Sequence, residues 1–198
     1  AEGRVSQGPA DAAVATLRHR GPDDESAVIF VSSDGVEFTQ DAPGRLGDGD
    51  GYRVALGHSR LSILDLDPRS NQPMRSDDGR FSLSYNGEIY NYVELRAELE
   101  SAGERFRTSG DTEVLLRALV RWGVGCIPRL NGMWAFALFD SLTGEVLLSR
   151  DRYGKKPLFY FHQGGTFVAA SEPKAIFCVL GERTRSVRPE MLAAFMQY

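Results

Sequence analysis

Residues 84–92 read SYNGEIYNY and join a strand-like run at 80–85 to a helical pattern at 91–102. An Asn-Gly pair after a strand is typical of a two-residue hairpin turn, but here a helix follows in place of a returning strand. The stretch is therefore predicted to be a strand-to-helix connection. It sets an amide side chain, a glycine and a carboxylate next to one another at 86–88.

The helix after this connection has recognisable end signals. Asn91 is predicted to cap its N-terminus, with Glu94 as the reciprocal partner in a capping box. Apolar residues then recur on one face until Gly103, a residue type that commonly follows the last turn of a helix. The pattern predicts a helix with one face packed on a sheet.

Outward from this connection, the predicted strands come mostly as hairpins and the helices come in pairs. The strands are expected at 26–31, 36–39, 52–64, 133–139, 145–151, 157–162 and 166–171, and further helices at 11–19, 111–122 and 174–179. This order favours antiparallel sheets covered by helices over a doubly wound parallel sheet. Because several strands are apolar on both faces, a layered α/β/β/α sandwich is predicted.

The composition excludes several classes of protein. With 198 residues, 25% charged residues and a formal net charge of −4, the chain has no basic surface suited to nucleic acid or an anionic membrane. The longest apolar run, 133–139, is too short to span a bilayer. Two cysteines, Cys126 and Cys178, make no disulfide framework, which favours a reducing compartment and a cytoplasmic protein. Both are expected to be packed as small apolar side chains.

No metal site is predicted. The three histidines, His19, His58 and His162, share no ligand spacing and are expected to be structural. The stretch GDGDG at 47–51 imitates the start of a calcium loop, but it lacks a third acidic ligand, and the twelfth position would be Ser59 where a glutamate is needed.

Polar residues at the ends of predicted elements each allow two interpretations. Arg60 lies inside an apolar strand, so its partner is either an internal carboxylate or the carboxylate of a ligand. Asp111 begins a helix and is either an N-cap or a carboxylate that receives a ligand's ammonium group. Asn86-Gly87 is either a turn or a pair of donors for an oxyanion.

Eight motifs occur in order along the chain. They read RHRGPDDE (18–25), GHSRLSILDL (57–66), QPM (72–74), YNGEIYNYVELRAELE (85–100), SGDTEVLL (109–116), LNGMWAFALFD (130–140), SRDRYGKKPLFY (149–160) and ASEPKAI (170–176). Together they resemble the class II glutamine amidotransferase (glutaminase) domain of glutamine-hydrolysing asparagine synthetases, over nearly the whole chain. The resemblance implies an α+β fold of the N-terminal-nucleophile (Ntn) type, an α/β/β/α sandwich of antiparallel sheets.

The resemblance also assigns roles to the polar residues. Asn86 and Gly87 would form the oxyanion hole over the side-chain amide of glutamine. Glu88 and Asp111 would hold the α-ammonium group, and Arg60 the α-carboxylate. The backbone lining the pocket would come from Leu61, Ser62, Ile63 and Leu64. These roles agree with the chemistry of a zwitterion, whose recognition needs a cation, one or two carboxylates and donors that polarise the amide.

The nucleophile of the resembled family is an N-terminal cysteine whose own α-amine acts as the base. This chain begins Ala1-Glu2-Gly3-Arg4, which aligns with the loop after the family's first strand. We expect a strand of about eight residues carrying that cysteine ahead of Ala1. Without it, the chain as printed is expected to be inactive.

The resemblance further implies an organisation and a reaction. Residues 1–185 would be the glutaminase domain lacking its first strand, and 186–198 the lead-in to a C-terminal ATP-dependent synthetase domain. The glutaminase domain would need no cofactor, since ATP and Mg belong to the synthetase domain. Ammonia released from L-glutamine would amidate an acceptor, with aspartate to asparagine favoured, and a homodimer is one expected assembly. The alternative is a catalytically inactive glutamine-binding or scaffold module, because the nucleophile is not in this chain.

Overall fold

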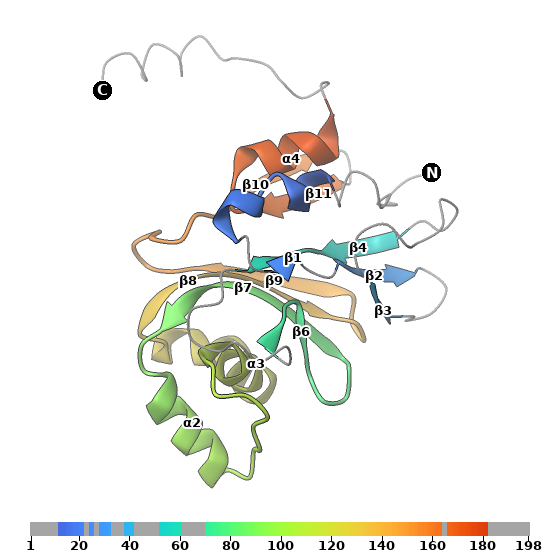
Figure 1. Cartoon of the computed structure of the whole chain (residues 1–198). Helices are drawn as coiled ribbons and strands as arrows, with labels where there is room; N and C mark the ends of the chain where they lie inside the picture. The colour runs from blue at the N-terminus through green and yellow to red at the C-terminus, as the bar shows by residue number, and fades with distance from the viewer. Residues whose placement is uncertain are drawn as a thin grey trace.

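The computed structural model describes residues 12–21, 24–25, 28–32, 38–41, 52–60, 70–163 and 166–181. A four-stranded antiparallel sheet lies at the centre of these residues (Figure 1). In spatial order its strands are β6 (Met74–Arg75), β7 (Phe81–Ile89), β8 (Gly132–Asp140) and β9 (Glu145–Arg150).

Two helices, α2 (Tyr92–Ser101) and α3 (Asp111–Trp122), cover one face of the central sheet, and a 3-10 segment, η3 (Gly123–Arg129), follows α3 (Figure 1). Side chains alternate between the faces of a strand, so alternate residues of β7 and β8 pack on these helices. The sheet residues of this main core are Leu83, Tyr85, Ile89, Trp134, Phe136 and Leu138.

A second layer of strands lies on the other face of the central sheet (Figure 1). It contains the antiparallel sheet β3-β2-β4 and the short pair β1-β5. These strands are β1 (Asp24–Glu25), β2 (Val28–Ser32), β3 (Phe38–Asp41), β4 (Tyr52–Leu56) and β5 (Ser59–Arg60). Leu56 packs on Phe139, and the Ser84 hydroxyl donates to the Gly57 carbonyl at 3.1 Å, so the two layers are in contact.

The last described elements form the outer layer on that side. Strands β10 (Phe159–Gln163) and β11 (Thr166–Ala170) make a hairpin, and α4 (Pro173–Leu180) packs on it. The segment η1 (Arg18–Arg20) forms hydrogen bonds with Glu172, the N-cap residue of α4. His19 and Arg20 each contact Glu172 Oε1 at 2.9 Å. The order of helices, two sheets and helix confirms the predicted antiparallel α/β/β/α sandwich (Figure 1).

The predicted connection at 84–92 is the main correction. Strand β7 does not end at 85 but continues through 86–88 to Ile89, because β8 pairs with it along the whole length. Nine consecutive residue pairs, from Phe81↔Asp140 to Ile89↔Gly132, outweigh the local tendency of Asn-Gly to turn.

The predicted capping box is also wrong. Asn91 does occupy the N-cap position of α2, but its side chain makes no capping hydrogen bond. Its Nδ2 donates to the Arg129 carbonyl at 3.0 Å, and its Oδ1 accepts from the Asn131 N–H at 2.8 Å. Asn91 therefore ties the start of α2 to the start of β8.

The strand predicted over 52–64 is interrupted, since residues 57–58 separate β4 from β5. The hairpins of β2 with β3, β8 with β9 and β10 with β11 are confirmed. Several predicted features lie outside the described residues: 33–35, 44–51, 61–64, 164–165 and 186–198. Of the helices in the described ranges, none combines the length and apolar character that crossing a bilayer requires.

Candidate functional site

Asn86 and Glu88 are positioned by the alternation of β7. Leu83, Tyr85 and Ile89 pack toward the helices, so the residues between them point toward the second layer. Ser84 lies on this face, and its hydroxyl is 3.4 Å from Nδ1 of His58, which follows β4. Asn86 and Glu88 follow on the same face, toward the end of the strand.

The N–H of Gly87 points to the edge of β7 that β8 does not cover. On this edge the Tyr85 N–H donates to Gln72 Oε1 at 2.6 Å, and the Ile89 N–H donates to Asp111 Oδ2 at 2.9 Å. Successive N–H groups of a paired strand point to opposite edges, so the Gly87 N–H lies between these two. A backbone donor and the Asn86 amide next to it are the two kinds of group that bind an oxyanion.

Only a glycine fits at position 87. A Cβ there would lie 2.3 Å from the Met133 carbonyl oxygen, 2.9 Å from Trp134 Cα and 2.6 Å from Tyr85 Cε2. Two of these neighbours are backbone atoms of β8, which cannot give way without breaking the pairing. The missing side chain therefore lets β8 approach closely, directly behind the N–H at the open edge.

Asp111 lies at the first residue of α3, and Gly110 is the N-cap, so the N-cap interpretation of Asp111 is wrong. Its carboxylate reaches across to β7, where Oδ2 accepts from the Tyr85 hydroxyl at 2.8 Å and from the Ile89 N–H at 2.9 Å. Burial raises the pKa of Asp111, the two donors oppose the shift, and the negative charge of Glu88 adds to it. The charge of Glu88 thus affects the pKa of Asp111, and the joint binding of an ammonium group by the two carboxylates stays a prediction.

The start of α3 is held by a second carboxylate, Glu113. It accepts hydrogen bonds from the N–H groups of Arg107 and Thr108, from the Thr108 hydroxyl and from the Arg117 guanidinium. These bonds fix the chain that enters α3 and with it the position of Asp111.

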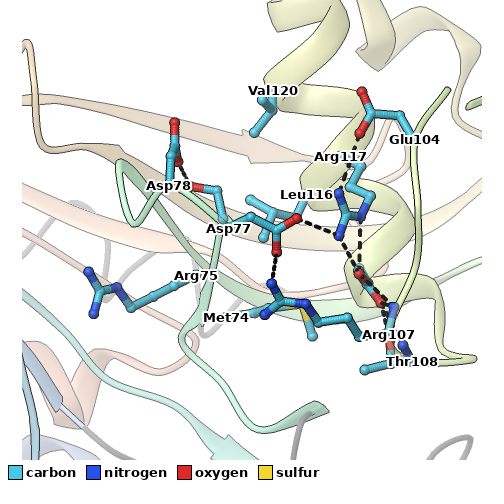
Figure 2. A pocket seen from close by; sticks show the side chains of 12 residues that line it. Met74, Arg75, Asp77, Asp78, Glu104, Arg107, Thr108, Leu116, Arg117 and Val120 are labelled. Carbon is cyan, nitrogen blue, oxygen red and sulfur yellow. Dashed lines mark hydrogen bonds and ion pairs between the residues drawn. The ribbon is translucent and has the colours of Figure 1, made fainter. Parts of the chain in front are cut away.

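Glu113 also lines a cavity of about 490 Å³ between β6, the 104–108 segment and α3 (Figure 2). Asp77 bridges Arg107 and Arg117 at 2.7 and 3.1 Å, and Glu104 contacts Arg117 at 3.3 Å (Figure 2). None of the predicted site residues lines this cavity, and its main charges neutralise one another. The cavity is therefore a poor candidate for the site.

The structure places the backbone of Arg60 but not its side chain. Arg60 pairs with Asp24 between β5 and β1, two residues beyond His58, which contacts β7. The four residues from Leu61 to Leu64 lie outside the described residues. The structure therefore places Asn86, Gly87 and Glu88 in succession on β7, next to the Ile89 N–H from which Asp111 accepts. The contacts of the Arg60 side chain stay a prediction.

Comparison with known proteins decides the family. A family described as the glutamine amidotransferase domain matches residues 3–198. The chain belongs to this family. An asparagine synthetase (glutamine-hydrolysing) of Bacillus subtilis, numbered 3, is 40% identical over 127 residues, 63% of this chain and 20% of that protein. Another from the same organism, numbered 2, is 35% identical over 173 residues, 87% of this chain and 19% of that protein.

A solved structure supports the same fold for this glutamine amidotransferase domain. Glutamine phosphoribosylpyrophosphate amidotransferase from B. subtilis, in complex with ADP and GMP, superposes with a TM-score of 0.69 at 27% identity. The match covers 89% of this chain and 42% of that one. It confirms the predicted Ntn-type fold. The chain spans less than a third of the length of its curated relatives.

Two residues of this amidotransferase domain had no role predicted from the sequence. Tyr85 bonds Asp111 from within the main core, and nothing in its local pattern distinguishes it from other core aromatic residues. Asp151, in the motif SRDRYGKKPLFY, accepts from the N–H groups of Trp134, Tyr153, Lys155 and Lys156. Although burial raises the pKa of Asp151, these four donors lower it overall. Asp151 thereby fixes β8 at Trp134, the residue paired with Gly87.

The two cysteines take no part in this site. Cys126 is fully buried in η3, and burial raises the pKa of its thiol to about 11, which makes the thiolate scarce. Cys178 is part-buried in α4, far along the chain from the site residues. The sequence predicts both cysteines to be packed side chains. This prediction is confirmed for Cys126, and the part-buried Cys178 agrees with it.

Proposed function

We propose that this domain hydrolyses L-glutamine and supplies ammonia for an ATP-dependent amidation. Glutamine would lie against the end of β7, with its amide carbonyl at the Asn86 side chain and the Gly87 N–H. Its α-ammonium would contact Glu88 and Asp111, and its α-carboxylate Arg60, next to a pocket lined by Leu61, Ser62, Ile63 and Leu64. In each of these contacts, a group of the protein is complementary in charge or hydrogen bonding to a group of the zwitterion.

The observation that carries this proposal is the geometry at Gly87. Its N–H points to the strand edge that β8 does not cover, while its Cα is pressed against β8 with no room for a side chain. A rigid donor of this kind stabilises charge that develops on an oxygen, because it needs no reorganisation during the reaction.

The proposed nucleophile is the thiol of an N-terminal cysteine, with its own α-amine as base. We further propose that ATP and Mg act in a synthetase domain and that this domain uses no cofactor of its own. Several relatives are named as asparagine synthetases, so aspartate is the proposed acceptor. A cytoplasmic location and a homodimer complete the proposal.

The test compares two activities of the natural full-length protein. Glutamate release from L-glutamine measures the glutaminase, and amidation with free ammonia measures the synthetase. Arg60→Ala is expected to raise the KM for glutamine about 100-fold, since an ion pair with the substrate carboxylate is lost, and to leave ammonia-dependent amidation unchanged. Arg105→Ala, at an exposed position outside the site, is the matched control.

The outcomes separate the alternatives. Equal loss of both activities in Arg60→Ala would contradict the assigned role of Arg60. Binding of glutamine by the wild-type protein without release of glutamate would favour the inactive glutamine-binding module. Labelling with an electrophilic glutamine analogue, followed by mass spectrometry, identifies the nucleophile directly.

A further inference from the structure

We propose that Tyr85 is a positioning residue of the glutamine site, which holds the Asp111 carboxylate and the Gly87 backbone in one rigid unit. This inference rests on the proposed function. It adds a residue that touches neither the substrate amide nor the substrate ammonium but acts through the two groups that do.

The hydroxyl of Tyr85 determines how Asp111 is oriented. It donates to Oδ2 at 2.8 Å, and the Ile89 N–H donates to the same oxygen at 2.9 Å. Two donors on one oxygen restrict the orientation of the carboxylate. Among the described residues, both hydrogen bonds that reach Asp111 from other residues go to Oδ2, and Oδ1 is the oxygen that would contact an ammonium group.

The ring of Tyr85 supports Gly87 from the helix side. Its Cε2 lies 2.6 Å from the place where a Gly87 Cβ would be, so the ring occupies the space that the glycine leaves empty. Tyr85 is itself 3% exposed and packs in the main core. The backbone donor at Gly87 is thus held between β8 and an aromatic ring.

Tyr85 is fixed at three points. Its N–H donates to Gln72 Oε1 at 2.6 Å, its hydroxyl donates to Asp111, and its backbone pairs with Phe136 in β8. Because none of the three contacts can shift alone, the position of the Tyr85 side chain fixes the positions of the groups that it contacts. One residue therefore sets the distance between the ammonium site and the oxyanion site.

Two substitutions separate the two roles in the full-length protein. Tyr85→Phe keeps the ring and removes the hydroxyl. It is expected to raise the KM for glutamine about tenfold, the effect of one hydrogen bond to a charged group, with kcat within about twofold. Tyr85→Leu also removes the ring behind Gly87, and kcat is expected to fall as well. Tyr153→Phe, at an exposed tyrosine, is the matched control.

A second substrate tests whether the effect passes through Asp111. Glutaramate is glutamine without its α-amino group, so it has no ammonium for Asp111 to bind. Tyr85→Phe should leave its kcat/KM unchanged relative to wild type, whereas kcat/KM for glutamine falls. An equal fall for both substrates would show a general loss of structure and overturn the proposal, as would an unchanged KM for glutamine.

Ammonia-dependent amidation, measured on the same preparations, reports the synthetase domain, and urea denaturation reports whether the glutaminase domain of each variant is folded. Failure of the wild-type protein to release glutamate from glutamine would overturn the proposed function, and this inference with it. Full glutaminase activity in wild type together with wild-type kinetics in Tyr85→Phe would overturn only the role of Tyr85.

Discussion

Two buried carboxylates on the first turn of α3, Asp111 and Glu113, are bonded in opposite ways. They are 6% and 5% exposed. Glu113 is surrounded by N–H and hydroxyl donors and pairs with Arg117 at 2.9 Å. Asp111 accepts only from neutral donors among the other described residues, and no described cation forms an ion pair with it.

This difference supports Asp111, and not Glu113, as the carboxylate that binds a ligand. A buried charge is stable only when it is paired and hydrogen-bonded, and Glu113 meets both conditions within the protein. Asp111 lacks the cation, and the nearby Glu88 adds a second negative charge. An ammonium group from a ligand would supply what is missing. The cavity beside Glu113 has no such unpaired buried charge, because its carboxylates pair with Arg107 and Arg117.

The largest expected effect is on stability, at Glu113. Glu113→Ala removes one of the carboxylate partners of Arg117 and leaves the N–H groups of Arg107 and Thr108 without their acceptor. We therefore expect the free energy of unfolding to fall by about 3–5 kcal/mol. Urea denaturation measures this change. The KM for glutamine of the fraction that remains folded should stay within about twofold of wild type. A selective rise in KM would show that Glu113 belongs to the binding site.

Gly87→Ala is expected to have the next largest effect, and it acts on catalysis. The new Cβ would meet the backbone of β8 and the ring of Tyr85, displacing the N–H at the strand edge. Loss of one oxyanion donor lowers kcat about 10²- to 10³-fold. Gly125→Ala is the matched control, because a Cβ there meets no atom within 4 Å. Equal kcat values for the two variants would contradict the role of Gly87.

Asp111→Asn distinguishes a binding carboxylate from a structural one. Asparagine still accepts from Tyr85 and Ile89 but carries no charge, so the KM for glutamine should rise about 100-fold. Stability should be unchanged or higher, because a buried charge without a cation is removed. Glutaminase kinetics and urea denaturation on one preparation check both signs. A clear loss of stability would mean that Asp111 is structural, like Glu113.

The same variant makes a prediction about pH. Burial raises the pKa of Asp111 above its ordinary value of 3.8, so the folded state holds the proton more tightly than the unfolded state. The contribution of Asp111 to stability is therefore complete below that value and is lost as the pH rises through the folded pKa. The stability of Asp111→Asn relative to wild type should increase as the pH rises above about 4. A constant difference across this range would contradict the shift.

Glu88→Gln is expected to have the smallest effect. Glu88 is only half-buried, and water screens its interaction with the substrate ammonium, so the KM for glutamine should rise about fivefold. Removing its charge should also lower the pKa of Asp111. The pH dependence of KM measures both changes. A larger effect than that of Asp111→Asn would reverse the order of the two carboxylates.

Much of the fold could be predicted from the chain itself. The bounds of α3, 111–122, follow from its amphipathic pattern and from Gly123, which adopts φ +56° where the helix ends. The apolar run at 133–139 becomes the buried strand β8. These elements are local consequences of side-chain period and backbone freedom, and the tertiary structure did not override them.

Other features had no local signal. Asn86-Gly87 looks like a turn, and only the pairing with β8 makes it part of a strand. Asn91 looks like a capping residue, but its side chain forms hydrogen bonds with backbone groups near the start of β8. The link from Tyr85 to Asp111 joins residues 26 positions apart. Such contacts depend on which segments pack together, and short-range patterns do not encode this.

By itself, the sequence determined the antiparallel layered fold, its family and the identity of the polar residues at the site, because residue types and their order carry that information. Only the tertiary structure decided that Gly87 has no room for a Cβ against β8, that Asp111 lacks a partner cation among the described residues, and that Glu113 has one. The reason is physical: hydrogen-bond satisfaction and burial are properties of neighbours in space, and the strands and α3 that supply these neighbours are distant in the chain.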